Sequence, residues 1–215
     1  MYNVLAITNR RLCKNNFLDQ IKNICLLNDK IRERKFDYKS YDNLSNINSI
    51  SIVLREKDLN EKDYKSLALK VMKICREYQT DCILHTYYKT ALELDCSKIH
   101  LPLHVINDNP KIINDFHTVG ASIHSIEEAI IADNLGVDYL TAGHIFNTDC
   151  KKGIPGRGLV FLNNIVSSVN IPVYAIGGIC SSNINQVIKT GAKGVCIMSG
   201  LMEINNPVEF FQPKD

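Results

Sequence analysis

The sequence predicts an α/β protein of the closed (β/α)8 barrel class, a TIM barrel, folded as a single domain over residues 1–215. Eight short apolar segments alternate with segments of helical periodicity, which is typical of βα units and a parallel sheet. No linker-like change in composition divides the chain. A doubly wound sheet rarely needs eight such units in so short a chain, whereas a small barrel does.

The expected strands are short and rich in aliphatic residues, and turn or helix signals bound each of them. They cover Asn3–Ile7, Ile50–Leu54, Cys82–Leu84, Lys98–Leu101, His117–Ile123, Val137–Ala142, Ile171–Ile176 and Gly194–Met198.

Helical periodicity fills most of the intervals between these strands. Ser125 and Glu128 have the spacing of a capping box, and the helix that they open ends at Gly136. The segment Asn28–Asn48 is polar and is either an irregular excursion or a weak extra helix. The other expected helices are Phe17–Leu27, Asp58–Tyr78, Tyr87–Leu94, Pro110–Phe116, Leu159–Val169, Ser182–Lys189 and a final helix or tail from Glu203 onward.

The composition is that of an ordinary soluble globular domain, with 45% hydrophobic and 22% charged residues. A net charge of +2 gives no reason to expect nucleic acid or an anionic membrane as a partner, so any anion site must be local. The eight cysteines show neither a CxxC pair nor zinc spacing, which predicts no metal site. Free thiols without an export signal predict a cytoplasmic protein.

Two glycine-containing segments follow the seventh and eighth expected strands, AIGGI at Ala175–Ile179 and IMSGL at Ile197–Leu201. In a barrel these two loops are neighbours, and their backbone N–H groups can approach an anion closely. The pair predicts a site for a phosphate monoester on a small molecule. The alternative is that these glycines only form tight turns.

The segment Tyr139–Gly158 combines a strand, a histidine directly after its end, and a loop rich in Gly and Lys. His144 is therefore the strongest acid–base candidate, and His85 and His124 also follow strand ends that face one mouth. His100 and His117 are expected to be structural and His104 to lie in a solvated loop. Arg55 and Lys57 either bind an anion or are solvated charges.

Four segments, SIHSIEEA, AGHIFNTDCKKG, IPVYAIGGI and GVCIMSGLM, together resemble the thiamine phosphate synthase superfamily. The resemblance is close over Gly120–Met202 and looser at Leu54–Lys57 (LREK). It implies a TIM barrel and a thiazole phosphate as the small-molecule partner. One branch couples a pyrimidine diphosphate to a thiazole phosphate with magnesium, and the other aromatises a thiazole carboxylate phosphate by a proton shift.

Several positions depart from the synthase pattern. Val53 stands where synthases carry Gln, and His85-Thr86 where they carry Asn-Asp. Pro102–Val105 replaces a GQxD motif, and His144 replaces the Pro of GPIF. Without those carboxylates Mg²⁺ lacks its oxygen ligands. The departures favour the thiazole tautomerase branch, an isomerase that needs neither a metal nor an organic cofactor; magnesium is expected only if the chain is a synthase.

The resemblance also implies roles for individual residues. His144 is the expected proton-transfer group, with His124 or His85 as a second base, and Arg55 or Lys57 would pair with the substrate carboxylate or stabilise developing charge. The other expected substrate-binding residues are Thr148, Asp149 and Cys150 on the thiazole phosphate, Gly178, Met198 and Ser199 at its phosphate, and Ser122 and Lys151, which match pyrimidine diphosphate contacts of synthases.

Two other functions stay open at this point. One is a thiamine phosphate synthase with altered metal ligands, and the other is a non-catalytic thiazole-phosphate binder that acts in regulation or delivery. The sequence is compatible with a homo-oligomer and does not define one.

Overall fold

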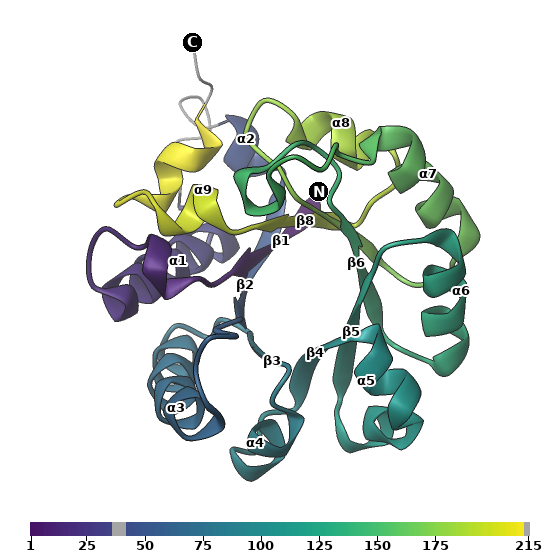
Figure 1. Ribbon diagram of the computed structural model, residues 1–215. Helices are drawn as coiled ribbons and strands as arrows, with labels where there is room; N and C mark the ends of the chain where they lie inside the picture. The colour runs from purple at the N-terminus through teal and green to yellow at the C-terminus, as the bar shows by residue number, and fades with distance from the viewer. Residues whose placement is uncertain (36–41, 213–215) are drawn as a thin grey trace.

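Eight parallel strands form one closed barrel in the computed structural model, which describes residues 1–35 and 42–212. Each strand pairs with the next one along the chain, and β8 pairs with β1 to close the ring (Figure 1). The predicted (β/α)8 fold class is therefore confirmed. The strands are β1 Tyr2–Ile7, β2 Ile47–Leu54, β3 Cys82–His85, β4 Lys98–Pro102, β5 Thr118–Ile123, β6 Tyr139–Gly143, β7 Val173–Ile176 and β8 Gly194–Ile197.

Helices surround the strands as an outer ring (Figure 1). The α-helices are α1 Phe17–Arg32, α2 Asp42–Ser45, α3 Glu61–Glu77, α4 Tyr88–Glu93, α5 Leu103–Asp108, α6 Ile126–Leu135, α7 Gly158–Ser168, α8 Ile184–Lys189 and α9 Ser199–Met202. Short 3₁₀ helices are η1 Arg10–Leu12, η2 Pro110–Asp115, η3 Asp149–Lys151 and η4 Pro207–Phe211.

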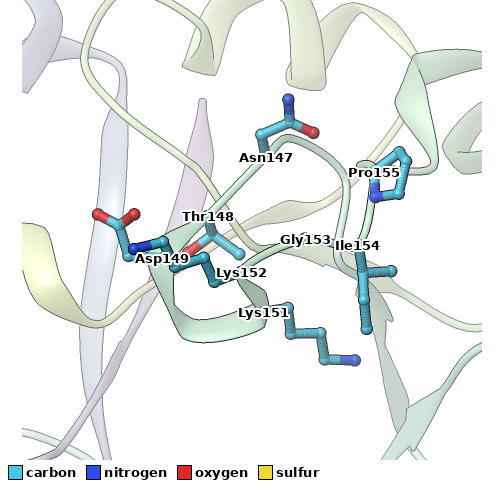
Figure 2. A pocket seen from close by; sticks show the side chains of 8 residues that line it. All are labelled: Asn147, Thr148, Asp149, Lys151, Lys152, Gly153, Ile154 and Pro155. Atoms are coloured by element: carbon cyan, nitrogen blue, oxygen red, sulfur yellow. The ribbon is translucent and has the colours of Figure 1, made fainter.

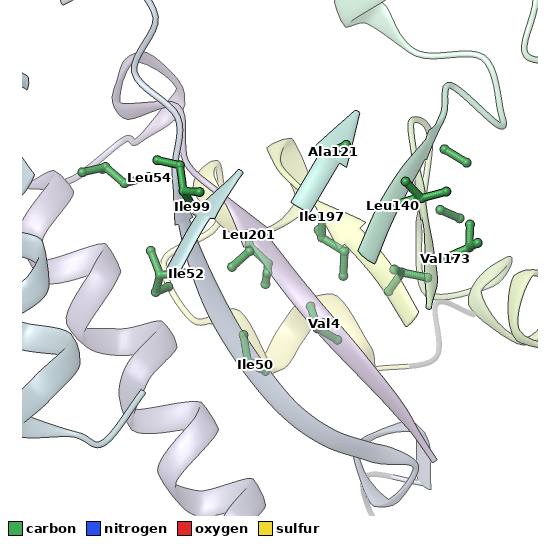
Figure 3. Close-up of a cluster of buried hydrophobic side chains, with 14 of the residues drawn as sticks. Val4, Ile50, Ile52, Leu54, Ile99, Ala121, Leu140, Val173, Ile197 and Leu201 are labelled. Carbon is green, nitrogen blue, oxygen red and sulfur yellow. The ribbon is translucent and has the colours of Figure 1, made fainter. Parts of the chain in front are cut away.

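Alternation along the strands separates two cores. Side chains such as Val4, Ile52 and Leu140 face outward and are buried against the helices (Figure 3). The strand residues between them face the barrel interior, where Val53 and Tyr139 belong to a second, smaller apolar cluster. The interior is therefore filled by side chains, as expected for an eight-stranded barrel.

The polar segment after the first predicted helix is more ordered than its composition indicates. α1 continues to Arg32, because Asn28 and Ile31 are buried on its inner face. The Asn28 amide accepts the Ile50 N–H at 2.7 Å and donates to the Thr80 hydroxyl at 3.0 Å, so a polar residue ties the helix to β2 and to the end of α3. The rest of the predicted excursion contains α2 and the start of β2, and residues 36–41 lie outside the described part of the chain.

Two helical predictions need correction around Pro110. The segment Pro110–Asp115 is a 3₁₀ helix, and α5 occupies the preceding stretch that the sequence left without a helix. α5 forms because Leu103 and Ile106 are both buried, three residues apart on one face. His104 consequently lies on a helix rather than in a loop.

The predicted capping box at the start of α6 is only half formed. The Ser125 hydroxyl accepts the Glu128 N–H at 3.1 Å, as expected of an N-cap. The Glu128 carboxylate instead accepts the N–H of His124, one residue before the cap. Glu128 thereby fixes the backbone at the end of β5.

Inside the barrel, Gly120 makes room for the ring of Tyr139. The two residues are paired in register between β5 and β6, and a Cβ atom on Gly120 would lie 2.1 Å from Cζ of Tyr139. Gly120 is also in register with His100 of β4. The missing side chain therefore allows the Tyr139 hydroxyl to reach across to His100 Nδ1, at 3.1 Å.

We expect Gly120→Ala to lower the free energy of unfolding by about 1–3 kcal/mol, the usual effect of overpacking a tight core. Chemical denaturation measures this loss. Tyr139→Leu removes the clashing ring, so the double variant Gly120→Ala/Tyr139→Leu should lose less than the two single variants together. Additive losses would contradict this account of the glycine.

Candidate active site

Parallel strands in a closed barrel bring all their carboxyl ends to one mouth, and the predicted site residues lie there. They are Arg55 and Lys57 after β2, Ser122 near the end of β5, His144 to Lys151 after β6, Gly178 after β7, and Met198 with Ser199 after β8. The structure thus gathers at one end a set of residues that the sequence spreads over 145 positions from Arg55 to Ser199.

Two buried histidines lie below this mouth. His85 and His100 are in register on β3 and β4, and their ring centroids are 5.4 Å apart. The Nε2 atom of His100 lies 2.8 Å from the Ser122 hydroxyl, and its Nδ1 atom contacts Tyr139. Nδ1 of His85 lies 2.6 Å from the Thr86 hydroxyl. His100 is partnered, as predicted, but its contact with Ser122 was not foreseen.

Both imidazoles are neutral over the physiological range. Burial, together with the nearby His100, Lys57 and Arg55, lowers the pKa of His85 to about 2. Burial likewise lowers the pKa of His100 to about 3, with added contributions from Lys57 and Arg55. The two histidines therefore act at the mouth as polar groups without charge.

Arg55 and Lys57 are cations without a carboxylate partner within residues 1–35 and 42–212. Burial lowers the pKa of Arg55, and Cys150 and Glu56 oppose this shift. Partial burial lowers the pKa of Lys57, and the repulsion of Arg55 adds to it. The pair forms a local positive site in a nearly neutral protein.

The carboxylate between these cations is already occupied. Glu56 is 2% exposed, and its carboxylate accepts the Arg10 backbone N–H at 3.0 and 3.2 Å and the Arg10 guanidinium at 3.0 Å. The same guanidinium binds Asp58 through two contacts of 2.6 Å. Glu56 therefore fastens the loop after β1 to the end of β2 and leaves Arg55 and Lys57 uncompensated.

His144 holds the loop between β6 and α7. Its Nε2 atom lies 3.1 Å from the Ile154 carbonyl oxygen. Because a carbonyl can only accept, Nε2 carries a proton and is the donor in this contact. Nδ1 is buried and is the one buried side-chain nitrogen or oxygen in the described chain without a partner. The Arg157 N–H donates to the His144 carbonyl at 3.0 Å, so both ends of the loop meet at this residue.

His124 supports the same loop from β5. Its Nδ1 atom lies 3.1 Å from the Gly143 carbonyl oxygen, directly before His144. The carbonyl again fixes the direction, with His124 as the donor. His124 and His144, both predicted to face the mouth as proton-transfer groups, are thus engaged with backbone carbonyls of one segment.

The loop that His144 holds encloses a hollow of about 480 Å³ (Figure 2). Its lining contains the predicted residues Thr148, Asp149 and Lys151, but none from another strand end. Figure 2 shows Lys151 extending away from Asn147, at the opposite side of the loop. Cys150 is exposed on η3 and does not line this hollow.

The glycines after β7 have a packing reason that the sequence did not reveal. A Cβ on Gly177 would lie 2.3 Å from Cβ of His144, and one on Gly178 would lie 2.5 Å from the Asn147 carbonyl oxygen. Both residues also have positive φ angles, of 98° and 66°. These glycines therefore let the β7 loop pack directly against the β6–α7 loop. Ser199 is exposed as the first residue of α9.

The resemblance to synthases implies a magnesium ion, but the donor groups at the mouth do not fit one. Within the described residues, no group of three or more His, Cys, Asp or Glu side chains is arranged to hold a metal ion. The positions His85-Thr86 and Pro102–Val105 offer no carboxylate, and Mg²⁺ requires oxygen ligands.

Comparison with known proteins identifies the family. A family model described as thiamine monophosphate synthase matches residues 4–201. The chain belongs to this family. The superfamily resemblance drawn from the motifs is thereby confirmed, and the chain stands among enzymes of thiamine biosynthesis. None of the helices in the part that the structure describes is long and apolar enough to cross a membrane.

Relatives with the synthase name match most of the chain. The thiamine-phosphate synthase of Clostridium acetobutylicum is 34% identical over 178 residues, which cover 80% of this chain and 83% of that protein. The one of Fusobacterium nucleatum is 36% identical over 156 residues, or 70% and 74% of the two chains. The solved thiamine phosphate pyrophosphorylase from Pyrococcus furiosus has a TM-score of 0.73 and 27% identity, over 98% and 92% of the two chains.

The prediction of a thiazole tautomerase, an isomerase, is therefore wrong. The relatives at 33–36% identity are named thiamine-phosphate synthases, and so the synthase alternative has the better support. The tautomerase prediction rested on the missing magnesium carboxylates and on His144 as the acid–base group. In the structure the ring of His144 is buried and its proton-bearing nitrogen is committed to Ile154.

We expect the imidazole of His144 to restrain the β6–α7 loop. Losing its hydrogen bond removes about 0.5–1.5 kcal/mol, so His144→Asn, which is too short to reach Ile154, should speed tryptic cleavage after Lys151 or Lys152 by about two- to tenfold. Limited proteolysis with mass spectrometry measures the rate. His144→Gln places an amide nitrogen near the position of Nε2 and should stay close to the native rate. Equal rates for all three proteins would refute the restraint.

Stability should fall below neutral pH because of His85 and His100. Their folded-state pKa values lie well below the unfolded value near 6.5, so the unfolded chain binds more protons as the pH falls through 6.5. Their contribution is complete above that pH, and about 2–3 kcal/mol is lost between pH 7 and pH 5.5. Urea unfolding at both pH values measures it. His85→Gln should remove about half of the loss, and the exposed control His117→Gln should leave it unchanged; an unaltered loss in His85→Gln would contradict the assignment.

Proposed function

We propose that the protein is a thiamine-phosphate synthase, a transferase that couples a pyrimidine diphosphate to a thiazole phosphate. The observation that carries the proposal is the uncompensated cation pair Arg55 and Lys57 at the barrel mouth, in a chain whose relatives bear the synthase name. A tautomerase handles one phosphate monoester. A synthase must also hold a diphosphate, and two cations after β2 at the mouth suit that larger charge.

The coupling forms a bond from the thiazole ring nitrogen to the exocyclic methylene carbon of the pyrimidine, while the carbon–oxygen bond to the diphosphate breaks. Inorganic pyrophosphate leaves with the bonding electrons, so negative charge develops on the departing oxygen. Arg55 and Lys57 would stabilise that charge, and such preorganised electrostatics are a major source of rate enhancement. No protein nucleophile is required.

The second substrate carries a phosphate that the other side of the mouth would hold. Thr148 on the β6–α7 loop and the backbone of Gly178 and Ser199 are the proposed contacts. The loops after β7 and β8 are a frequent phosphate site of this fold. Ser122, which the His100 imidazole orients at 2.8 Å, would contact the pyrimidine between the two phosphate regions.

His144 has a positioning role in this proposal. The hydrogen bond to Ile154 sets the closed shape of the β6–α7 loop, on which Thr148 and Lys151 lie. A residue that orders a substrate-covering loop affects substrate binding and turnover together.

Incubating the purified protein with the pyrimidine diphosphate and the thiazole phosphate tests the proposal. We expect thiamine phosphate and inorganic pyrophosphate in equal amounts, measured by liquid chromatography and a phosphate-release assay. Lys57→Met should lower kcat/KM for the diphosphate at least tenfold, because it removes a charge that is present when the diphosphate leaves. Lys70→Met removes an exposed charge on the outer face of α3 and should match the native protein.

Absence of thiamine phosphate at saturating concentrations of both substrates, with and without added Mg²⁺, would overturn the proposal. Tight binding of the thiazole phosphate without product would instead favour a binding or delivery protein.

A further inference from the structure

We infer that this mouth binds the diphosphate with its own cations and does not require a divalent metal ion to do so. The inference rests on the proposed function for the identity of the anion. It concerns how the negative charge is neutralised, and it departs from the magnesium dependence that the family resemblance implies.

The two carboxylates that follow β2 are already paired with arginines of the protein. Glu56 accepts three hydrogen bonds from Arg10, and Asp58 binds Arg10 and Arg11. Asp149 is exposed on η3 and is separate from both. A single exposed carboxylate leaves Mg²⁺ short of the oxygen ligands that the protein must supply.

The groups at the ends of β3 and β4 also fail as metal ligands. Both nitrogens of His100 are engaged, by Tyr139 and by Ser122. His85 uses Nδ1 for Thr86. Imidazole nitrogen suits zinc, copper or nickel better than magnesium, and two histidines without a third ligand do not form such a site. Both nitrogens of His100 and Nδ1 of His85 are therefore already hydrogen-bonded within the protein.

Two positive charges without a carboxylate partner in the described chain follow β2 at the mouth. Arg55 lowers the pKa of Lys57, and both cations lower the pKa values of the buried His85 and His100. A divalent cation at this point would be repelled by both side chains. An anion would instead favour their charged forms, which burial and the repulsion between them disfavour.

The β6–α7 loop supplies a third cation. Lys151 lies on η3, in the loop that follows β6 at the mouth, and lines the hollow there. Together Arg55, Lys57 and Lys151 bring three positive charges to a diphosphate with a similar negative charge. The guanidinium of Arg55 is also suited to bidentate contact with phosphate oxygens.

Inorganic pyrophosphate is the probe. Isothermal titration of the full chain in buffer with EDTA should show binding, and added Mg²⁺ should not tighten it more than about twofold. Arg55→Met and Lys57→Met should each weaken binding at least tenfold. Arg76→Met and Lys70→Met remove exposed charges on α3 and are the matched controls. Thermal melts of all four variants verify that each is folded, and Arg55→Lys provides a conservative variant that should retain part of the affinity.

Pyrophosphate binding that appears only with Mg²⁺, or binding in EDTA that survives both Arg55→Met and Lys57→Met, would overturn the inference. These results are independent of catalysis. Metal-free binding without formation of thiamine phosphate would refute the proposed function and leave the cation site standing. Formation of thiamine phosphate together with strictly magnesium-dependent binding of pyrophosphate would refute the inference and leave the proposed function standing.

Discussion

The pairing of β1 with β8 is the constraint on which the rest of the structure depends. Closure fixes the direction of every strand, so the loops after β2, β6, β7 and β8 share one rim. It also fixes which side chains point inward, because alternation leaves only one face for the interior. Arg55 is in phase with Val53 and so continues the inward-facing series of β2 beyond the end of the strand. An open sheet would leave β2 and β8 at distances that no common ligand could span.

Closure has a second consequence, which concerns polarity inside the barrel. The interior has an apolar cluster, and above it a polar layer formed by His85, His100 and Ser122. Burying imidazoles is tolerated here because they remain neutral and hydrogen-bonded. Gly120 is the condition for this arrangement, since only a missing side chain allows the Tyr139 ring to pass and meet His100. The polar layer therefore depends on register between strands as much as on the residues themselves.

The sequence was sufficient for the barrel, because apolar strands and amphipathic helices have distinct periods that survive in a single chain. It was insufficient where a contact across strands decides the outcome. His100 lies within an apolar strand, and nothing in its own neighbourhood indicates that Ser122 is 2.8 Å away. α5 was missed because two buried residues, Leu103 and Ile106, are too few for a periodic signal. The tautomerase prediction gave four departures from the synthase motifs, His144 among them, more weight than the overall relationship to synthases, and the ring of His144 proved to be committed to its own loop.

The balance of charges at the mouth connects stability with ligand binding. Arg55 and Lys57 have no carboxylate partner in the described chain, so their repulsion opposes folding when no ligand is present. Glu56 could have compensated them, but its carboxylate is directed to Arg10 in the loop after β1. A protein that needed only stability would pair these charges. An anion that binds the folded state alone supplies the missing compensation and stabilises the fold by mass action. In the proposed function the unpaired cations are half of an interaction whose other half is the substrate.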